Sequence, residues 1–264
     1  MNRIEKKFKE LRRQKKKAFV AFVTAGYPSL PFTRRLVVAM AENGADIIEL
    51  GVPFSDPMAD GPVIQEASHR ALQKGVTLGK VFQTVKAVRR RSQIPIALMT
   101  YYNPVFRYGE KRFAANAKKA GVDGLVIPDL PPEEARGLIA AARSYGLALV
   151  FFVSPTTPRA RMRNIALKST GFIYYVSVTG VTGARRRLPG GLHSNVRFLT
   201  RVTRKPVCVG FGVSDPAQVR AVGRVSDGVI VGSAIIKKIR QVKGDPDAVG
   251  KTARFVGQLA GALP

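Results

Sequence analysis

The stretch KPVCVGFGVSDPAQVRAVGRVSDGVIVGSAII (residues 205–236) contains two short apolar runs, PVCVG and GVIVG, joined by a helical stretch. Both runs are almost continuously apolar and do not alternate with polar residues. Such runs are typical of parallel strands that helices cover. The stretch therefore predicts one strand–helix–strand unit of a parallel sheet.

The same pattern recurs along the whole chain of 264 residues. The predicted strands are 18–26, 46–50, 95–100, 123–129, 147–155, 171–177, 205–212 and 227–233. About eight strand–helix units in a chain of about 250 residues fit a closed barrel. We therefore expect an α/β fold, a single-domain (β/α)8 TIM barrel over residues 1–264. A doubly wound open sheet is the alternative, but the first turn lacks the usual G-x-G-x-x-G signal.

Two segments add to the basic barrel. In the N-terminal segment 1–17, Ile4, Phe8 and Leu11 recur at helical spacing among many cations. This narrow apolar stripe predicts an extra N-terminal helix docked on the barrel, with a nucleic-acid or membrane-binding arm as the alternative. The connection after the second strand, 51–94, is the longest, which predicts an insertion there with a functional role.

Composition limits the class of protein. Lysine and arginine total 44 against 17 acids, a net charge of +27, which attracts anions but does not identify a function. The cations are dispersed, so no specific nucleic-acid partner is expected. The single cysteine, Cys208, indicates a reducing compartment, and no run is long enough to span a membrane, so a cytoplasmic location is expected. His69 and His193 lack ligand-spaced partners, so no metal site is predicted.

Glycines follow the last three predicted strands, in GVTG (180–183), GFG (210–212) and GS (232–233). In a barrel, the carboxyl ends of all strands open on one face, where active sites lie. Glycine allows backbone N–H groups to approach an anion closely, and Ser233 is placed to cap the following helix. The pattern predicts a phosphate site at a helix N-terminus.

Three carboxylates lie in the stretch ELGVPFSDPMADGP (49–62). Glu49 closes the second strand, where partial desolvation would raise its pKa towards a value useful for proton transfer. Asp60 lies on the returning loop, and two carboxylates in different environments can divide acid and base work. Spacing alone leaves a second interpretation open, in which Glu49 pairs with an arginine and Asp56 and Asp60 are turn residues.

Aromatic and apolar residues at other strand ends predict a small-molecule pocket with few polar groups. These residues are Phe22, Met99, Tyr101 and Tyr174. Tyr174 and Tyr175 are adjacent in a strand, so only one of them can face the barrel interior.

At this point the sequence resembles the α subunit of tryptophan synthase over essentially its whole length. The motifs that carry the resemblance are FVTAGYPS (22–29), ELGVPFSDPMADGPVIQ (49–65), MTYYNPVFRYG (99–109), GLVIPDLPPEE (124–134), SPTTP (154–158), YYVSVTGVTGAR (174–185), GFGVS (210–214) and GVIVGSAII (228–236). The resemblance implies a phosphate-binding barrel that cleaves indole-3-glycerol phosphate to indole and glyceraldehyde 3-phosphate.

The resemblance also implies roles for individual residues. Glu49 matches the catalytic glutamate that shuttles protons, Asp60 the aspartate that accepts a hydrogen bond from the indole N–H, and Tyr174 the active-site tyrosine. The phosphate positions are Gly183, Gly212, Gly232 and Ser233, and the indole pocket is Phe22, Met99, Tyr101 and Phe211. Thr182 falls in a lid of residues 178–190 that closes over the site.

A partner is implied as well. Indole would pass to a β subunit that carries pyridoxal phosphate, within an α2β2 heterotetramer, while this chain itself would need no cofactor. Pro53 and Asp56 match positions near that interface. The alternative is a chain that mainly activates the β subunit and has weak lyase activity. The chain departs from the family in its high positive charge, which includes Arg185, Arg186 and Arg187 in the lid.

Overall fold

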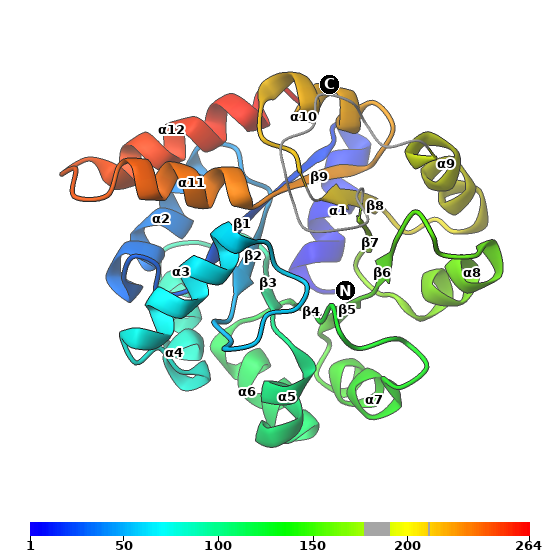
Figure 1. Cartoon of the computed structure of the whole chain (residues 1–264). Coiled ribbons are helices and arrows are strands. Elements are labelled where there is room, and N and C mark those ends of the chain that lie inside the picture. The colour runs from blue at the N-terminus through cyan, green and yellow to red at the C-terminus, as the bar shows by residue number, and fades with distance from the viewer. Residues whose placement is uncertain (177–190, 211) are drawn as a thin grey trace.

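The computed structural model describes residues 1–176, 191–210 and 212–264. Within these residues the strands form a single parallel sheet in the order β5-β4-β3-β2-β1-β9-β8-β7-β6, which curves into a barrel (Figure 1). The strands are β1 Ala18–Thr24, β2 Ile47–Gly51, β3 Ile96–Met99, β4 Gly124–Val126, β5 Ala148–Val150, β6 Phe152–Val153, β7 Ile173–Val176, β8 Val207–Gly210 and β9 Gly228–Val231. The predicted parallel α/β barrel is confirmed.

The fifth predicted strand, 147–155, was wrong as one continuous strand. It is divided at Phe151 into β5 and β6. β5 pairs with β4, whereas β6 pairs with β7 through the register Phe152↔Tyr174. The two halves differ in their partners because the chain passes from one edge of the sheet to the other at this point, and so brings the two edges together.

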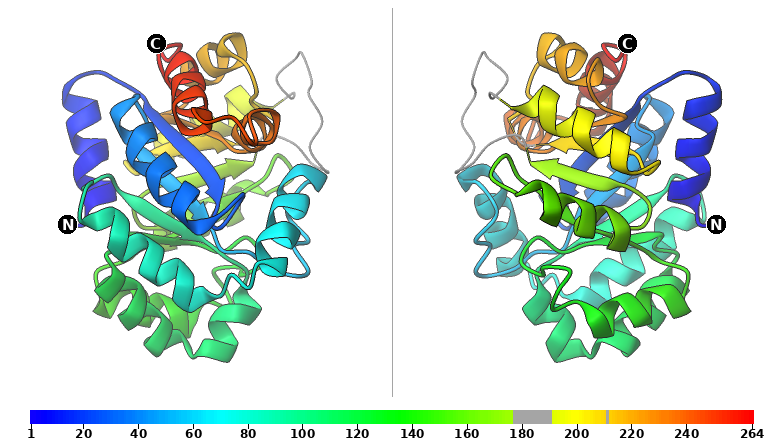
Figure 2. Two further views of the ribbon diagram at one scale, coloured as in Figure 1. Left: turned by 90° about the vertical axis from the view of Figure 1, so that its left-hand side faces the viewer. Right: turned by 90° about the vertical axis from the view of Figure 1, so that its right-hand side faces the viewer.

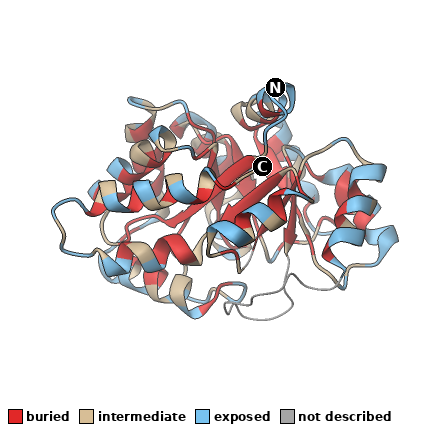
Figure 3. Cartoon of the chain, turned by 90° about the horizontal axis from the view of Figure 1, so that it is seen from above, coloured by how far each residue is buried: buried red, intermediate tan, exposed pale blue. Residues whose placement is uncertain are grey.

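Helices surround the barrel, with buried residues towards the strands and exposed residues outward (Figures 1 and 3). They are α1 Arg3–Arg13, α2 Leu30–Glu42, α3 Pro62–Gln73, α4 Leu78–Arg89, α5 Tyr102–Tyr108, α6 Glu110–Ala120, α7 Arg136–Ser144, α8 Arg159–Lys168, α9 Leu192–Val202, α10 Pro216–Gly223, α11 Ser233–Gln241 and α12 Ala248–Ala260. Among the described residues, no helix has both the length and the apolar character needed to cross a membrane.

Helix α1 is the predicted additional N-terminal helix. Asn2 caps it in a reciprocal capping box with Glu5, and Ile4, Phe8 and Leu11 are all buried. The Phe8 ring lies 5.8 Å from the ring of Phe172, just before β7. The stripe therefore docks the helix at the amino ends of the strands, at the opposite end of the barrel from α3 (Figure 2).

The insertion after β2 contains two helices, α3 and α4, and begins with the loop 52–61. Pro62 is the first residue of α3, where proline is well tolerated because its missing N–H would have no partner in the helix. α3 contacts both β1 and α11. The insertion thus lies over the carboxyl ends of the strands, where it can form one wall of a site.

The amino end of the barrel contains an ion-pair network that the sequence did not reveal. Asp123, 1% exposed, accepts hydrogen bonds from Arg3 Nη1 at 3.0 Å, Arg89 Nη2 at 2.7 Å and the Ile96 N–H at 2.9 Å. Burial lowers the pKa of Arg89 to about 10, although Asp123 acts in the opposite direction. One buried carboxylate thus ties α1, α4 and β3 together.

Replacing Asp123 with asparagine should destabilise the fold by about 2–4 kcal/mol, because removing one partner of a buried pair leaves the charge of Arg89 uncompensated. For a chain of this size, that corresponds to a fall of roughly 5–15 °C in the thermal unfolding midpoint. The matched control is Glu133→Gln, which breaks the exposed pair with Arg161 at 3.2 Å. We expect the control to change stability by less than about 1 kcal/mol. Equal effects of the two substitutions would show that the Asp123 network does not stabilise the barrel.

Candidate active site

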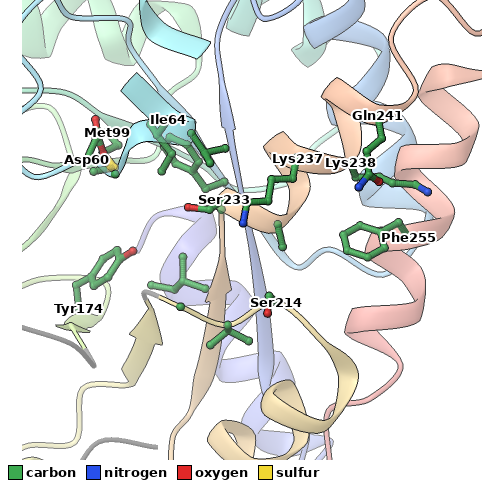
Figure 4. A pocket seen from close by; sticks show the side chains of 18 residues that line it. Asp60, Ile64, Met99, Tyr174, Ser214, Ser233, Lys237, Lys238, Gln241 and Phe255 are labelled. Carbon is green, nitrogen blue, oxygen red and sulfur yellow. The ribbon is translucent and has the colours of Figure 1, made fainter. Parts of the chain in front are cut away.

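A cavity of about 290 Å³ opens at the carboxyl ends of the strands (Figure 4). It is bordered by residues from the loop after β2, from β1, β3, β7 and β9, and from α3, α11 and α12. The predicted site residues that border it are Phe22, Asp60, Met99, Tyr174, Gly212, Gly232 and Ser233. The fold therefore brings together residues from distant parts of the chain.

Glu49 lies below this cavity, inside the barrel. The sequence placed it at the end of a strand, but β2 continues to Gly51, since its ladder with β3 extends that far. Glu49 is 1% exposed, and within the described residues neither carboxyl oxygen has a hydrogen-bond partner. Burial, followed by the neighbouring Asp60, raises the pKa of Glu49 to about 8. Its carboxyl group is thus mainly protonated at neutral pH.

Asp60 lies beside Glu49 and borders the cavity. Its side chain is buried, and Oδ1 has no partner among the described residues. Burial raises the pKa of Asp60 to about 6, and a hydrogen bond from Tyr101 opposes the rise. At neutral pH this carboxyl group is therefore mainly ionised, while Glu49 is mainly neutral. Spacing had left open that Glu49 pairs with an arginine. That interpretation was wrong, because within the described residues neither carboxyl oxygen of Glu49 has a partner.

Tyr101 lies behind Asp60 and does not border the cavity. Its hydroxyl accepts a hydrogen bond from the Ala59 N–H at 2.9 Å, and its ring stacks on Phe54 with 5.2 Å between centroids. Tyr101 thus supports the loop that carries Asp60. Its contact with an indole ring stays a prediction.

Of the two adjacent tyrosines, Tyr174 borders the cavity and Tyr175 lies on the other side of its strand. The Tyr174 ring stacks on Phe152 at 4.5 Å, whereas the Tyr175 hydroxyl accepts a hydrogen bond from Asn195 of α9 at 3.1 Å. Burial raises the pKa of Tyr174 well above its ordinary value, so its phenol stays neutral. Any Cβ at Gly210 would lie 2.7 Å from the Tyr174 hydroxyl, so glycine is required there.

The apolar part of the cavity is formed by Phe22 and Met99, both almost fully buried. Two glycines make room for the Phe22 ring, because a Cβ would lie 2.8 Å from it at Gly51 and 3.1 Å from it at Gly232. The sequence analysis missed Gly51. A glycine inside an apolar strand is the signal that could have found it, since it marks a close approach of another group.

The other end of the cavity lies at the start of α11. Gly212, with φ of 85°, and Gly232 border it together with Ser233. The prediction that Ser233 caps this helix was wrong: Gly232 is the capping residue, Ser233 is the first helical residue, and no side chain caps the helix. The N–H groups of the first turn are thus left without a side-chain cap, as suits an anion site.

Several predicted residues lie outside this part of the structure. Thr182, Gly183 and Phe211, with the lid 178–190, fall outside the described residues. In the loop after β2, Pro53 is buried and Asp56 is exposed. Of these two predicted interface positions, only Asp56 is accessible on the surface of the chain.

The cavity also has borders that the sequence analysis did not select. They include Ile64 of α3, Ile230 of β9, and Lys237 and Lys238 of α11. The charged residues had no distinct signal among the many lysines of the chain. Together with the predicted residues, they give a cavity with an apolar end, two adjacent carboxyl groups and a helix N-terminus. This arrangement suits proton transfer to an apolar molecule that carries an anionic group.

Comparison with known proteins identifies the family. The family model described as tryptophan synthase alpha chain matches residues 8–263. The tryptophan synthase alpha chain of Geobacter sulfurreducens is 52% identical over 263 residues, which is 100% of this chain and 99% of the relative. That of Geotalea daltonii is 52% identical over 244 residues, 92% of each chain.

Solved structures agree with this result. Tryptophan synthase subunit alpha from Legionella pneumophila superposes with a TM-score of 0.92 at 36% identity, covering 100% of this chain and 98% of that one. A chain of Mycobacterium tuberculosis tryptophan synthase gives 0.91 at 35% identity, covering 99% and 98%. From its sequence, its barrel and the position of its site, this chain belongs to the tryptophan synthase alpha chain family.

Proposed function

We infer that this chain is a carbon–carbon lyase that cleaves indole-3-glycerol phosphate to indole and glyceraldehyde 3-phosphate, as its family membership indicates. The observation that carries the assignment of residues is the pair of buried carboxyl groups, Glu49 and Asp60. Their pKa values of about 8 and about 6 leave one protonated and one ionised at neutral pH. Such a pair can divide acid and base work in a retro-aldol reaction.

Asp60 recognises the indole ring. Its ionised carboxylate borders the cavity near its apolar end, where Figure 4 shows it beside Met99, and it has a free oxygen within the described residues. An indole placed between these groups donates its N–H to Asp60. When the ring is protonated, positive charge develops at that nitrogen, and the carboxylate stabilises it.

Glu49 moves the proton. In its neutral form it donates a proton to the ring carbon that bears the side chain, and becomes a carboxylate. That carboxylate then accepts the proton of the neighbouring side-chain hydroxyl as the carbon–carbon bond breaks, which gives the aldehyde and restores the neutral acid. The steps balance with no net proton gained or lost, and each needs only one carboxyl group.

The phosphate lies at the start of α11. Backbone N–H groups near Gly212 and Gly232, and the hydroxyl of Ser233, are its donors, with Gly183 as a further position from the family motif.

Tyr174, a neutral phenol at the side of the cavity, is placed to contact the reacting part of the substrate. We also assign two further parts to the site. One is Phe211, as part of the indole pocket, and the other is the lid 178–190, which contains Thr182.

The partner is a tryptophan synthase β subunit, which holds the pyridoxal phosphate and uses the indole, in an α2β2 heterotetramer. The exposed loop around Asp56 supports a docking surface near the mouth, because Met58 beside it is 85% exposed. A partner that covered this loop would remove the apolar Met58 side chain from water. We also propose that residues 1–264 form one domain, since every strand of the described residues belongs to one sheet.

Glu49→Gln should lower kcat for indole release by about 10³-fold, because it removes the proton donor while keeping the size of the side chain. Indole release from indole-3-glycerol phosphate is followed spectroscopically. Glu133→Gln, the same change at an exposed position, should leave kcat unchanged. If Glu49→Gln retained more than a tenth of the activity, Glu49 would not be the proton donor.

The same substitution should change how stability depends on pH. Because the native state holds the proton of Glu49 up to about pH 8 and the unfolded state loses it near its ordinary value of 4.5, stability of the unsubstituted chain falls as pH rises between these values. Glutamine cannot ionise. We therefore expect Glu49→Gln to gain on the order of 4 kcal/mol relative to the unsubstituted chain from pH 5 to pH 9.

Thermal unfolding midpoints of both proteins across this pH range measure the gain. A difference that stays constant from pH 5 to pH 9 would mean that Glu49 titrates normally. The difference in unfolding midpoint between Glu133→Gln and the unsubstituted chain should not change with pH over the same range.

Tyr101→Phe should lower kcat/KM by about tenfold, because it removes the group that accepts the Ala59 N–H and donates to Asp60. The Tyr101 hydrogen bond lowers the pKa of Asp60, so its loss should move the acid limb of the kcat/KM profile from near pH 6 to higher pH. Tyr175→Phe removes a hydroxyl on the outer side of the same barrel and should leave the limb in place. If the acid limb of Tyr101→Phe did not shift, the Tyr101 hydroxyl would not control the pKa of Asp60.

A further inference from the structure

The three cations of α11 have different surroundings. Arg240 donates to Glu66 of α3 at 3.1 Å, and the Lys238 ammonium lies 5.9 Å from the centre of the Phe255 ring. For Lys237, neither an ion pair nor a ring contact is found within the part of the chain that the structure describes. Its charge is the one on this helix that is left without a protein partner there.

Lys237 also borders the active-site cavity. It lies one helical turn after Ser233, and long side chains on a helix point back towards its N-terminus. Figure 4 shows the Lys237 side chain running from α11 towards Ser233, while Lys238 lies with Gln241 and Phe255 at the far end of the cavity. The ammonium group of Lys237 thus extends to the end of the cavity where the helix begins.

The phosphate donors assigned so far are all neutral. A phosphate monoester carries about −1.5 to −2 charges at neutral pH. The same cavity contains the Asp60 carboxylate, whose pKa of about 6 leaves it mainly ionised at neutral pH. A bound substrate would therefore place a second anionic group in a small space, and a nearby cation would offset the repulsion.

We propose that Lys237 supplies the positive charge that binds the phosphate of the substrate and selects phosphorylated over unphosphorylated molecules. This role rests on the proposed function, since it takes the phosphate to lie at the start of α11. A lysine provides a flexible point charge that adjusts to the bound anion. Its contact lies far from the bond that breaks, so it should stabilise the bound substrate and the transition state about equally.

The test compares Lys237→Gln with two references. Lys237→Arg retains the charge, and Lys243→Gln removes the same charge from an exposed residue just after α11 that does not border the cavity. We expect Lys237→Gln to raise KM for indole-3-glycerol phosphate about tenfold with kcat changed less than threefold, and to weaken binding of glycerol 3-phosphate, measured by calorimetry, by a similar factor. Lys237→Arg should stay within about threefold of the unsubstituted chain, and Lys243→Gln within about twofold.

A second substrate separates phosphate binding from a general structural effect. For indole-3-glycerol, which lacks the phosphate, kcat/KM should be the same in Lys237→Gln as in the unsubstituted chain. Equal losses on both substrates, or equal losses from Lys237→Gln and Lys243→Gln, would overturn the proposal.

The outcome is also distinct from failure of the proposed function. If the unsubstituted chain does not cleave indole-3-glycerol phosphate but binds glycerol 3-phosphate, the lyase assignment fails, and the binding comparison still decides the role of Lys237. If it does not bind glycerol 3-phosphate, the role of Lys237 is overturned.

Discussion

The burial of two adjacent carboxyl groups without a countercharge is the constraint on which the site depends. Within the described residues, Glu49 has no hydrogen-bond partner and Asp60 has one free oxygen, and both are almost fully buried. Removing a carboxylate from water is costly unless it is paired, so the more buried group stays protonated and the other ionises. The unequal burial of the two side chains thus creates one acid and one anion from similar residues.

At the opposite end of the barrel, another buried carboxyl group is compensated by positive charge. Asp123 is as buried as Glu49, but Arg3 and Arg89 both donate to it. There the carboxyl group of Asp123 joins separate elements of the fold through its ion pairs. A buried carboxylate with partners stabilises the structure, whereas a buried carboxyl group without them keeps its proton to a higher pH. The two ends of one barrel therefore accommodate a buried carboxyl group in different ways: Asp123 in ion pairs, and Glu49 without a partner among the described residues.

Much of this could be predicted from the sequence, because apolar runs and strand-end glycines are local signals. The parallel barrel and the docked helix with Ile4, Phe8 and Leu11 follow from periodicity alone. Periodicity also requires that only one of Tyr174 and Tyr175 face inward, but it was the resemblance to the family that selected Tyr174. The division of the fifth strand could not be predicted, because it depends on which neighbour each half pairs with. The position of Lys237 at the cavity could not be predicted for another reason. The chain has 44 lysines and arginines, and no local sequence pattern distinguishes this one from the others.

Local placement, not total charge, determines what a charge does in this chain. The net charge of +27 raises the concentration of any anion near the surface, but it cannot orient a substrate. The cavity can, because it has the Asp60 carboxylate near its apolar end and a helix N-terminus with Lys237 at the other. A molecule with an N–H donor at one end and a dianion at the other fits this polarity in only one direction. In the proposed reaction, that direction places the ring above Glu49, the residue that we assign as the proton donor.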